Sequence, residues 1–168
     1  MRVPESCVLM HDGEVVPLYS LAKGKRVALV FLRHLGCIFC REQVATLRDT
    51  MPEANIVFVT MAGPRLAARF RTWIRSPHPF VCDADRELYH AFGLERGSFA
   101  QVFAPNVAAR GLAALRKGHR PGRLTEDPWQ LGGSFVMDDQ GCVSASFPAS
   151  DAGDHPSPEA LKRALTSP

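Results

Sequence analysis

Cys37 and Cys40 are the residues of this chain whose type and spacing best suit chemistry. Side chains three residues apart on a helix lie on the same face, close enough for two sulfurs to form a disulfide. A thiolate with a second thiol within reach can attack a disulfide or a peroxide, and the second sulfur then resolves the product. The spacing therefore predicts a redox-active pair.

The position of Cys37 at the start of a helix favours its thiolate. A buried strand is expected to end just before Gly36, and a helix is expected over residues 37–50. Unpaired backbone N–H groups and the helix dipole stabilise a negative charge at such a helix start. Burial deeper in the helix raises a thiol pKa, so we expect Cys37 to attack and Cys40 to resolve.

Four residues outside the pair are further candidates for the functional site. Arg33 is placed to stabilise a thiolate or a developing oxyanion, and the alternative is a solvent-facing charge at the strand end. His34 is either a proton donor or a solvated loop histidine. Ser134, which follows Gly133, either hydrogen-bonds the reactive sulfur or packs as a strand residue. His34, Gly133 and Ser134 are therefore candidate substrate-binding residues.

A zinc site is the main competing interpretation of the pair, and the sequence argues against it. One Cys-x-x-Cys supplies half of a zinc site, and no second pair or suitably spaced histidine supplies the other half. A purely structural pair would require Cys37 to be buried, whereas a residue after a strand-ending glycine is expected at the accessible rim of a sheet. We expect neither a metal nor a bound cofactor.

The other three cysteines, Cys7, Cys82 and Cys142, lie in apolar stretches and are expected to be buried as small hydrophobic residues. Asp151, Asp154 and His155 precede the last expected helix. Turn formation and capping explain these three residues more simply than metal binding does.

Composition and charge narrow the class of protein. The 168 residues are 46% hydrophobic and carry a formal net charge of +3, which is too small to predict nucleic-acid binding. The longest apolar run covers residues 27–32, too short to span a bilayer. No apolar signal segment follows the first residues, so we expect a cytoplasmic protein. An acid-free basic segment over 110–123 either steers an anionic substrate or forms a solvated face.

Apolar runs and helical patterns alternate along the chain. Strands are expected over residues 7–10, 14–18, 26–35, 55–61, 80–82, 133–137 and 142–147. Helices are expected over 37–50, 64–74, after the cap at 83–85, over 99–117 with a weak point at Pro105, and from Ser157 to about Leu165. The helix over 64–74 is expected to bury an apolar stripe of Leu66, Phe70, Trp73 and Ile74. The order predicts one α/β domain over 1–168, with a mixed sheet covered by helices on both faces.

Residues 33–42, 83–94, 130–141 and 151–156 resemble the peroxiredoxin-like branch of the alkyl hydroperoxide reductase/thiol-specific antioxidant (AhpC/TSA) family. The resemblance covers nearly the whole chain. It implies a thioredoxin-like fold with an N-terminal β extension. It also implies a peroxide or disulfide substrate and a thioredoxin-like or small-thiol reductant, with no membrane partner, and it leaves a homodimer open.

The chain departs from the standard motifs of this superfamily. Aligned on Cys40, the peroxiredoxin motif places Arg33 at its proline and Cys37 at its peroxide-orienting threonine, and that alignment would make Cys40 the peroxide-reactive sulfur. Gly133 occupies the position of the thioredoxin cis-proline. The alternatives to a thiol-dependent oxidoreductase are a non-enzymatic redox sensor or binding module, and a specialised reductase of an endoperoxide or a biosynthetic intermediate.

Overall fold

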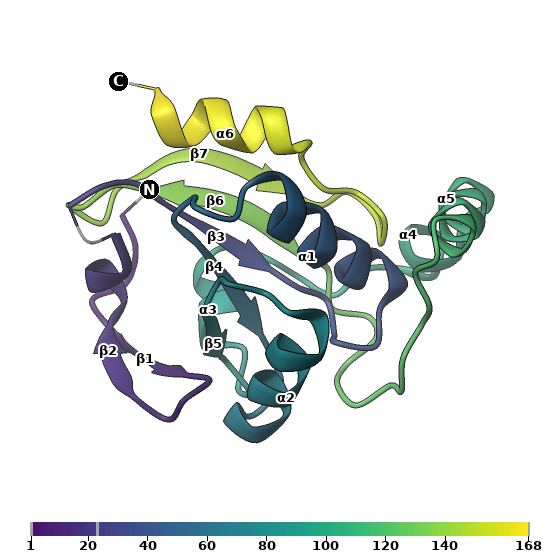
Figure 1. Cartoon of the computed structure of the whole chain (residues 1–168), viewed down its shortest axis with the longest axis horizontal. Helices are drawn as coiled ribbons and strands as arrows, with labels where there is room; N and C mark the ends of the chain where they lie inside the picture. The colour runs from purple at the N-terminus through teal and green to yellow at the C-terminus, as the bar shows by residue number, and fades with distance from the viewer. Residues whose placement is uncertain (1, 23, 168) are drawn as a thin grey trace.

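A seven-stranded mixed sheet runs through the centre of the molecule in the order β2-β1-β5-β4-β3-β6-β7 (Figure 1). The structure is a computed structural model that describes residues 2–22 and 24–167. The strands are β1 (Cys7–Met10), β2 (Val15–Pro17), β3 (Val27–Phe31), β4 (Ile56–Thr60), β5 (Phe80–Cys82), β6 (Gly133–Met137) and β7 (Val143–Pro148). The helices are η1 (Leu18–Ala22), α1 (Ile38–Thr50), α2 (Pro64–Ile74), α3 (Glu87–Ala91), α4 (Phe99–Phe103), α5 (Pro105–Arg116) and α6 (Pro158–Thr166).

The central strand β3 is buried along its whole length. It pairs in parallel with β4 and antiparallel with β6, so both of its edges are hydrogen-bonded. Five consecutive apolar residues form it, as expected for a strand covered on both faces. The end of β3 therefore holds the start of the turn before α1 in a fixed position.

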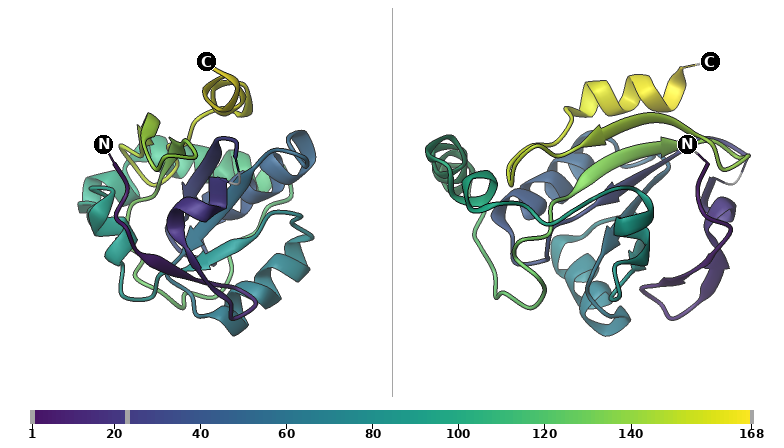
Figure 2. Two further views of the ribbon diagram at one scale, coloured as in Figure 1. Left: turned by 90° about the vertical axis from the view of Figure 1, so that its left-hand side faces the viewer. Right: turned by 180° about the vertical axis from the view of Figure 1, so that it is seen from behind.

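Helices cover both faces of the sheet (Figures 1 and 2). On one face, Ala28 and Val30 of β3 pack in a core with residues of α1, α2 and α6. On the other face, Leu29 and Phe31 pack with η1 and α3. The α/β, thioredoxin-like fold with a β1–β2 hairpin as its N-terminal extension is confirmed.

The expected elements are confirmed in order, with local corrections. The strand expected over 26–35 is only β3, and the helix expected over 99–117 is broken into α4 and α5 before Pro105. The expected apolar stripe of α2 is wrong in part, because Leu66 and Trp73 are 36% and 62% exposed. Ala67 lies in the core instead.

Two of the three cysteines that were expected to be buried are exposed. Cys7 lies on the outward-facing side of β1, where buried and exposed residues alternate, and Cys142 lies at the turn before β7. Only Cys82 is buried as expected. The apolar residues next to Cys7 and Cys142 in the sequence therefore did not predict burial of these two cysteines.

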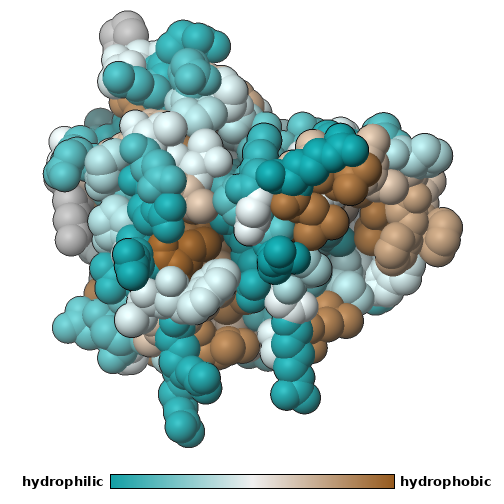
Figure 3. All heavy atoms as spheres, turned by 45° about the vertical axis from the view of Figure 1, so that its right-hand side comes forward, coloured by the Kyte–Doolittle hydropathy of each residue, from teal (hydrophilic) through white to brown (hydrophobic). Residues whose placement is uncertain are grey.

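The helices α4 and α5 stand apart from the sheet (Figure 1). None of the residues of α4 is buried, and Phe99 and Phe103 are 71% and 57% exposed. Figure 3 shows hydrophobic atoms gathered on this side of the molecule. In the described part of the chain, no helix is long and apolar enough to span a bilayer.

Candidate active site

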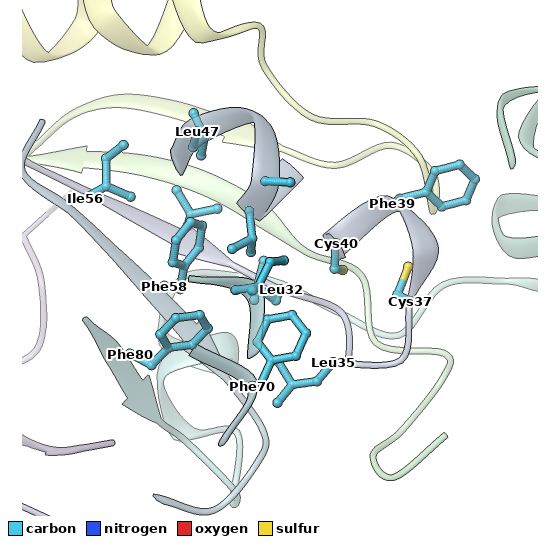
Figure 4. Packing of buried hydrophobic residues seen from close by; sticks show 14 of the residues in the cluster. Leu32, Leu35, Cys37, Phe39, Cys40, Leu47, Ile56, Phe58, Phe70 and Phe80 are labelled. Atoms are coloured by element: carbon cyan, nitrogen blue, oxygen red, sulfur yellow. The ribbon is translucent and has the colours of Figure 1, made fainter. Parts of the chain in front are cut away.

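The turn between β3 and α1 carries Cys37, as the sequence predicted. Cys37 is the N-cap residue of α1, its backbone N–H donates to the carbonyl of His34, and its own carbonyl accepts from Arg41 N–H. Cys40 lies in the first turn of the helix, and Figure 4 shows both sulfurs at this end of α1 (Figure 4). Both thiols are free, so the structure holds the reduced pair.

The expectation that Cys37 lies at an accessible rim is wrong, and the burial that a purely structural pair requires is present. Cys37 and Cys40 are 5% and 4% exposed. A loop over residues 118–129 covers the turn, because Gly122 N–H donates to the carbonyl of Gly36 at 2.9 Å. A methyl group on Gly36 would lie 2.3 Å from the carbonyl oxygen of Arg123, which shows how closely the two backbones approach. This cover comes from a segment more than eighty residues away in sequence.

Arg33 contacts both sulfurs and is buried, so the alternative of a solvent-facing charge is wrong. Its Nη1 donates to Cys37 Sγ at 3.4 Å, and its backbone N–H donates to Cys40 Sγ at 3.2 Å. Its Nε and Nη2 donate to the carbonyls of Gln130 and Pro128. The guanidinium is therefore held in place by the loop before β6 while it faces the pair.

The two thiols have pKa values shifted in opposite directions. The pKa of Cys37 is lowered to about 6, first because the Cys40 thiol donates a hydrogen bond to the Cys37 thiolate. The charge of Arg33 and backbone N–H groups add to this effect, while burial opposes it. The pKa of Cys40 is raised well above its usual value by burial and by its hydrogen bond to Cys37. The arrangement favours one thiolate and one thiol at neutral pH.

His34 is neutral at physiological pH. Burial, followed by the charges of Arg33 and Arg41, lowers its pKa to about 4. Its Nδ1 is buried and has no hydrogen-bond partner among the described residues. The alternative of a fully solvated histidine is wrong, and the ring is an uncharged, largely buried group.

Gly133 and Ser134 lie on β6, next to the strand that leads to the pair. Gly133 pairs with Phe31 and Ser134 with Val30. Ser134 is fully buried, and its Oγ has no hydrogen-bond partner in the described part of the chain. The structure therefore brings Gly133 close to the pair, whereas Ser134 makes no hydrogen bond to either sulfur. No peptide bond of the described residues is cis.

A small cavity of about 20 Å³ lies beside Cys40. Arg33, Gly132 and Gly133 line it, together with Phe31, Phe39, Gln43, Ala149, Asp151, Ala152, Asp154 and His155. No sequence signal points to Gln43 as a residue of this cavity, and the sequence around Asp154 predicts only a turn. The turn itself is confirmed, because Asp154 accepts hydrogen bonds from the backbone and hydroxyl of Ser150.

Two acidic residues near this cavity form ion pairs with cations of the basic segment. Asp151 pairs with Arg110 at 2.6 Å, and Glu42 pairs with Lys117 at 2.7 Å. Among residues 2–22 and 24–167, no group of three or more metal-ligating side chains is found. Two cations of the basic segment over 110–123 thus hold α5 against the rest of the site.

The fold is that of a peroxiredoxin-like protein of the thioredoxin-like superfamily. Residues 41–150 match the model of a family described as AhpC/TSA antioxidant enzyme, and the chain belongs to that family. Its crystallised neighbours include peroxidoxin BcpB from Mycobacterium tuberculosis, with a TM-score of 0.67, 18% identity and coverage of 98% of this chain and 92% of that one.

Curated relatives agree with this assignment. The chain is 31% identical to peroxiredoxin-like 2C from Homo sapiens, over 80% of this chain and 66% of the relative. It is 26% identical to the chloroplastic thioredoxin-like protein AAED1 from Arabidopsis thaliana, over 94% and 68%. It is 25% identical to prostamide/prostaglandin F synthase from Pongo abelii, over 95% and 86%. The chain thus spans about two thirds of the length of the first two relatives.

Proposed function

We propose that this chain is a thiol-dependent oxidoreductase that reduces peroxide or disulfide substrates with the Cys37–Cys40 pair. Its family is one of antioxidant enzymes, which supports thiol-based redox chemistry in general. The observation that carries the specific proposal is the opposite shift of the two thiol pKa values beside the Arg33 guanidinium. A nucleophile and its resolving partner require this difference.

With a disulfide substrate, the Cys37 thiolate attacks one sulfur, forms a mixed disulfide and releases the other sulfur as a thiolate. Cys40 then loses its proton and attacks Cys37 Sγ, which forms the internal disulfide and releases the second substrate thiol. The substrate gains two electrons and the pair loses two. Gly133 lines the cavity beside Cys40, and we propose that it and His34, next to Arg33 in the sequence, border the bound substrate.

With a peroxide, the attacking thiolate takes one oxygen as the O–O bond breaks, and the other oxygen leaves as an alcohol or water after it gains a proton. The sulfenic acid then condenses with the second thiol and releases water, which forms the same disulfide. Cys40, rather than Cys37, lines the small cavity, and a cavity of about 20 Å³ has room for little more than a water-sized molecule. Cys40 thus borders the space open to a small peroxide, but its raised pKa keeps it mostly a thiol, so Cys37 remains the proposed attacking sulfur.

After reaction with either a disulfide or a peroxide, two molecules of a small thiol, or one molecule of a thioredoxin-like dithiol, return the pair to the reduced state. The chemistry requires only the sulfurs of the chain and the external reductant. We propose a cytoplasmic location, where such thiols are abundant. A homodimer is compatible with this chemistry and is not required for it.

The proposed function is tested by multiple turnover. The protein is mixed with hydrogen peroxide or with an insulin disulfide, in excess dithiothreitol, and substrate loss is compared with that in a Cys37→Ser/Cys40→Ser variant. Many turnovers per chain, together with a Cys37–Cys40 disulfide found by mass spectrometry in the absence of reductant, are expected. A disulfide that forms without turnover indicates a redox sensor. Turnover only with an endoperoxide indicates a specialised reductase.

A further inference from the structure

A groove of about 590 Å³ lies next to the turn that carries Cys37 and shares no lining residue with the cavity at Cys40. Its apolar floor consists of Leu35, Leu66, Phe70 and Trp73, and Figure 4 shows Leu35 against Phe70 near the Cys37 turn. The remaining lining residues are Arg41, Arg69, Arg123 and Thr125. Helix α2, the start of α1 and the loop over 118–129 therefore meet at this groove.

Three guanidinium groups and no carboxylate line the groove, as far as the described residues show. Arg41 is held by the carbonyls of Leu35 and Arg120 and lies 4.6 Å from the centre of the Trp73 ring. The side chains of Arg69 and Arg123 make no hydrogen bond or ion pair within residues 2–22 and 24–167. At the lower edge of the molecule, which is the level of α2 in Figure 1, Figure 3 shows projecting hydrophilic side chains with hydrophobic atoms between them.

Unpaired guanidinium groups around an apolar floor are complementary to a small organic anion, because they bind carboxylates by charge-assisted hydrogen bonds. The groove also adjoins the turn that carries Cys37, although Cys37 itself does not line it. Leu35 is two residues before Cys37, and Arg41 lies in the first turn of α1. Burial lowers the pKa of Arg41, and the nearby Cys37 charge opposes that shift. An anion in this groove thus lies next to the turn that carries Cys37.

We infer that this groove binds a carboxylate-bearing small thiol, which reduces the Cys37–Cys40 disulfide. The inference rests on the proposed function. The thiolate of the bound molecule attacks Cys37 Sγ, the disulfide bond breaks, and Cys40 leaves as a thiolate and takes up a proton. A second molecule of the thiol attacks the mixed disulfide and releases a small-molecule disulfide, so two thiols supply the two electrons.

The test is a series of thiols that differ in charge. Mercaptoacetate is anionic, 2-mercaptoethanol is neutral and cysteamine is cationic. Each thiol is mixed with protein that carries the preformed disulfide, the reaction is stopped with acid at successive times, and the fraction reduced is measured by mass spectrometry. For each thiol, the rate constant of an Arg69→Gln/Arg123→Gln variant is divided by that of the unsubstituted protein, so intrinsic thiol reactivity cancels. Arg65→Gln, an exposed residue of the same helix outside the groove, is the matched control.

The double substitution is expected to lower the rate constant for reduction by mercaptoacetate about fivefold and to leave that for 2-mercaptoethanol within about twofold of its original value. The loss for mercaptoacetate should be smaller at high salt. Arg65→Gln should change none of the three rates. Equal losses for all three thiols, or no loss for mercaptoacetate, would overturn the inference.

A second measurement does not depend on redox chemistry. S-methylglutathione, which has two carboxylates and no free thiol, is titrated into the reduced protein while the amide NMR signals of residues 66–73 are followed. Saturable shifts that the double substitution abolishes support the groove, and their absence contradicts it. If the Cys37–Cys40 disulfide does not form at all, the proposed function fails, and this titration alone decides whether the groove binds anions.

Discussion

The Nη1 atom of Arg33 donates to Cys37 Sγ at 3.4 Å, while the backbone N–H of the same arginine donates to Cys40 Sγ. One residue thus stabilises negative charge on both sulfurs that the proposed reaction uses. The side chain acts on the sulfur with the lower pKa. The backbone contact does not depend on the side chain and would survive its replacement.

Replacement of the guanidinium is therefore expected to affect Cys37 selectively. In Arg33→Gln the pKa of Cys37 should rise from about 6 toward its usual range, because a favourable charge is lost from a buried site. The rate of iodoacetamide alkylation at Cys37, followed against pH by mass spectrometry, measures this shift. An unchanged titration midpoint would contradict the role assigned to Arg33, and Arg26→Gln, far along β3 from the pair, is a suitable control.

The order in which the sulfurs react can be read from single substitutions. If Cys37 attacks first, Cys40→Ser should still form a mixed disulfide with a chromogenic disulfide reagent at Cys37, whereas Cys37→Ser should react at least ten times more slowly. The physical reason is that the pKa of Cys40 is raised, so little of it is thiolate at neutral pH. Single-turnover absorbance kinetics measure both rates. Faster reaction of Cys37→Ser with hydrogen peroxide would instead assign the attack on peroxide to Cys40.

Acid is expected to weaken the fold through His34. The pKa of this histidine is about 4 in the folded chain and close to its ordinary value of 6.5 when unfolded. Between these values the unfolded chain binds the extra proton, so stability rises with pH through this window and is lost as pH falls through it. Urea denaturation between pH 4 and pH 7 should show this dependence, and His34→Asn should reduce it. His90→Asn, at an exposed histidine of α3, should not.

The loop over 118–129 is expected to limit access to Cys37. In Gly36→Ala, the new methyl group would lie 2.3 Å from the carbonyl oxygen of Arg123, so the loop must shift. Alkylation of Cys37 at pH 8 should become several times faster. Gly63→Ala introduces a methyl group with no heavy atom within 4 Å and should leave that rate unchanged. Equal rates in both variants would show that the loop does not control access.

The fold was predictable from the sequence because its signals are local. The continuous apolar residues of β3 and β4, and the proline at the start of α2, mark these elements without reference to the rest of the chain. The position of Cys37 at the start of α1 follows from the same local pattern. Cys7 and Cys142 were misjudged because burial depends on the position of a strand in the sheet, which local composition does not encode.

The surroundings of the pair were less predictable because they come from distant segments. Arg33 is buried because the carbonyls of Pro128 and Gln130 accept its hydrogen bonds. Asp154 and His155 reach the cavity at Cys40 because the chain after β7 crosses it. The sequence contains these residues but gives no signal of which of them meet.

The carbonyls that hold Arg33 belong to residues 95 and 97 positions further along the chain. During synthesis, the two cysteines emerge from the ribosome long before this segment exists, and the guanidinium then has no fixed position beside them. The contribution of the Arg33 charge to the low pKa of Cys37 is therefore expected to appear only once this segment has folded against the pair.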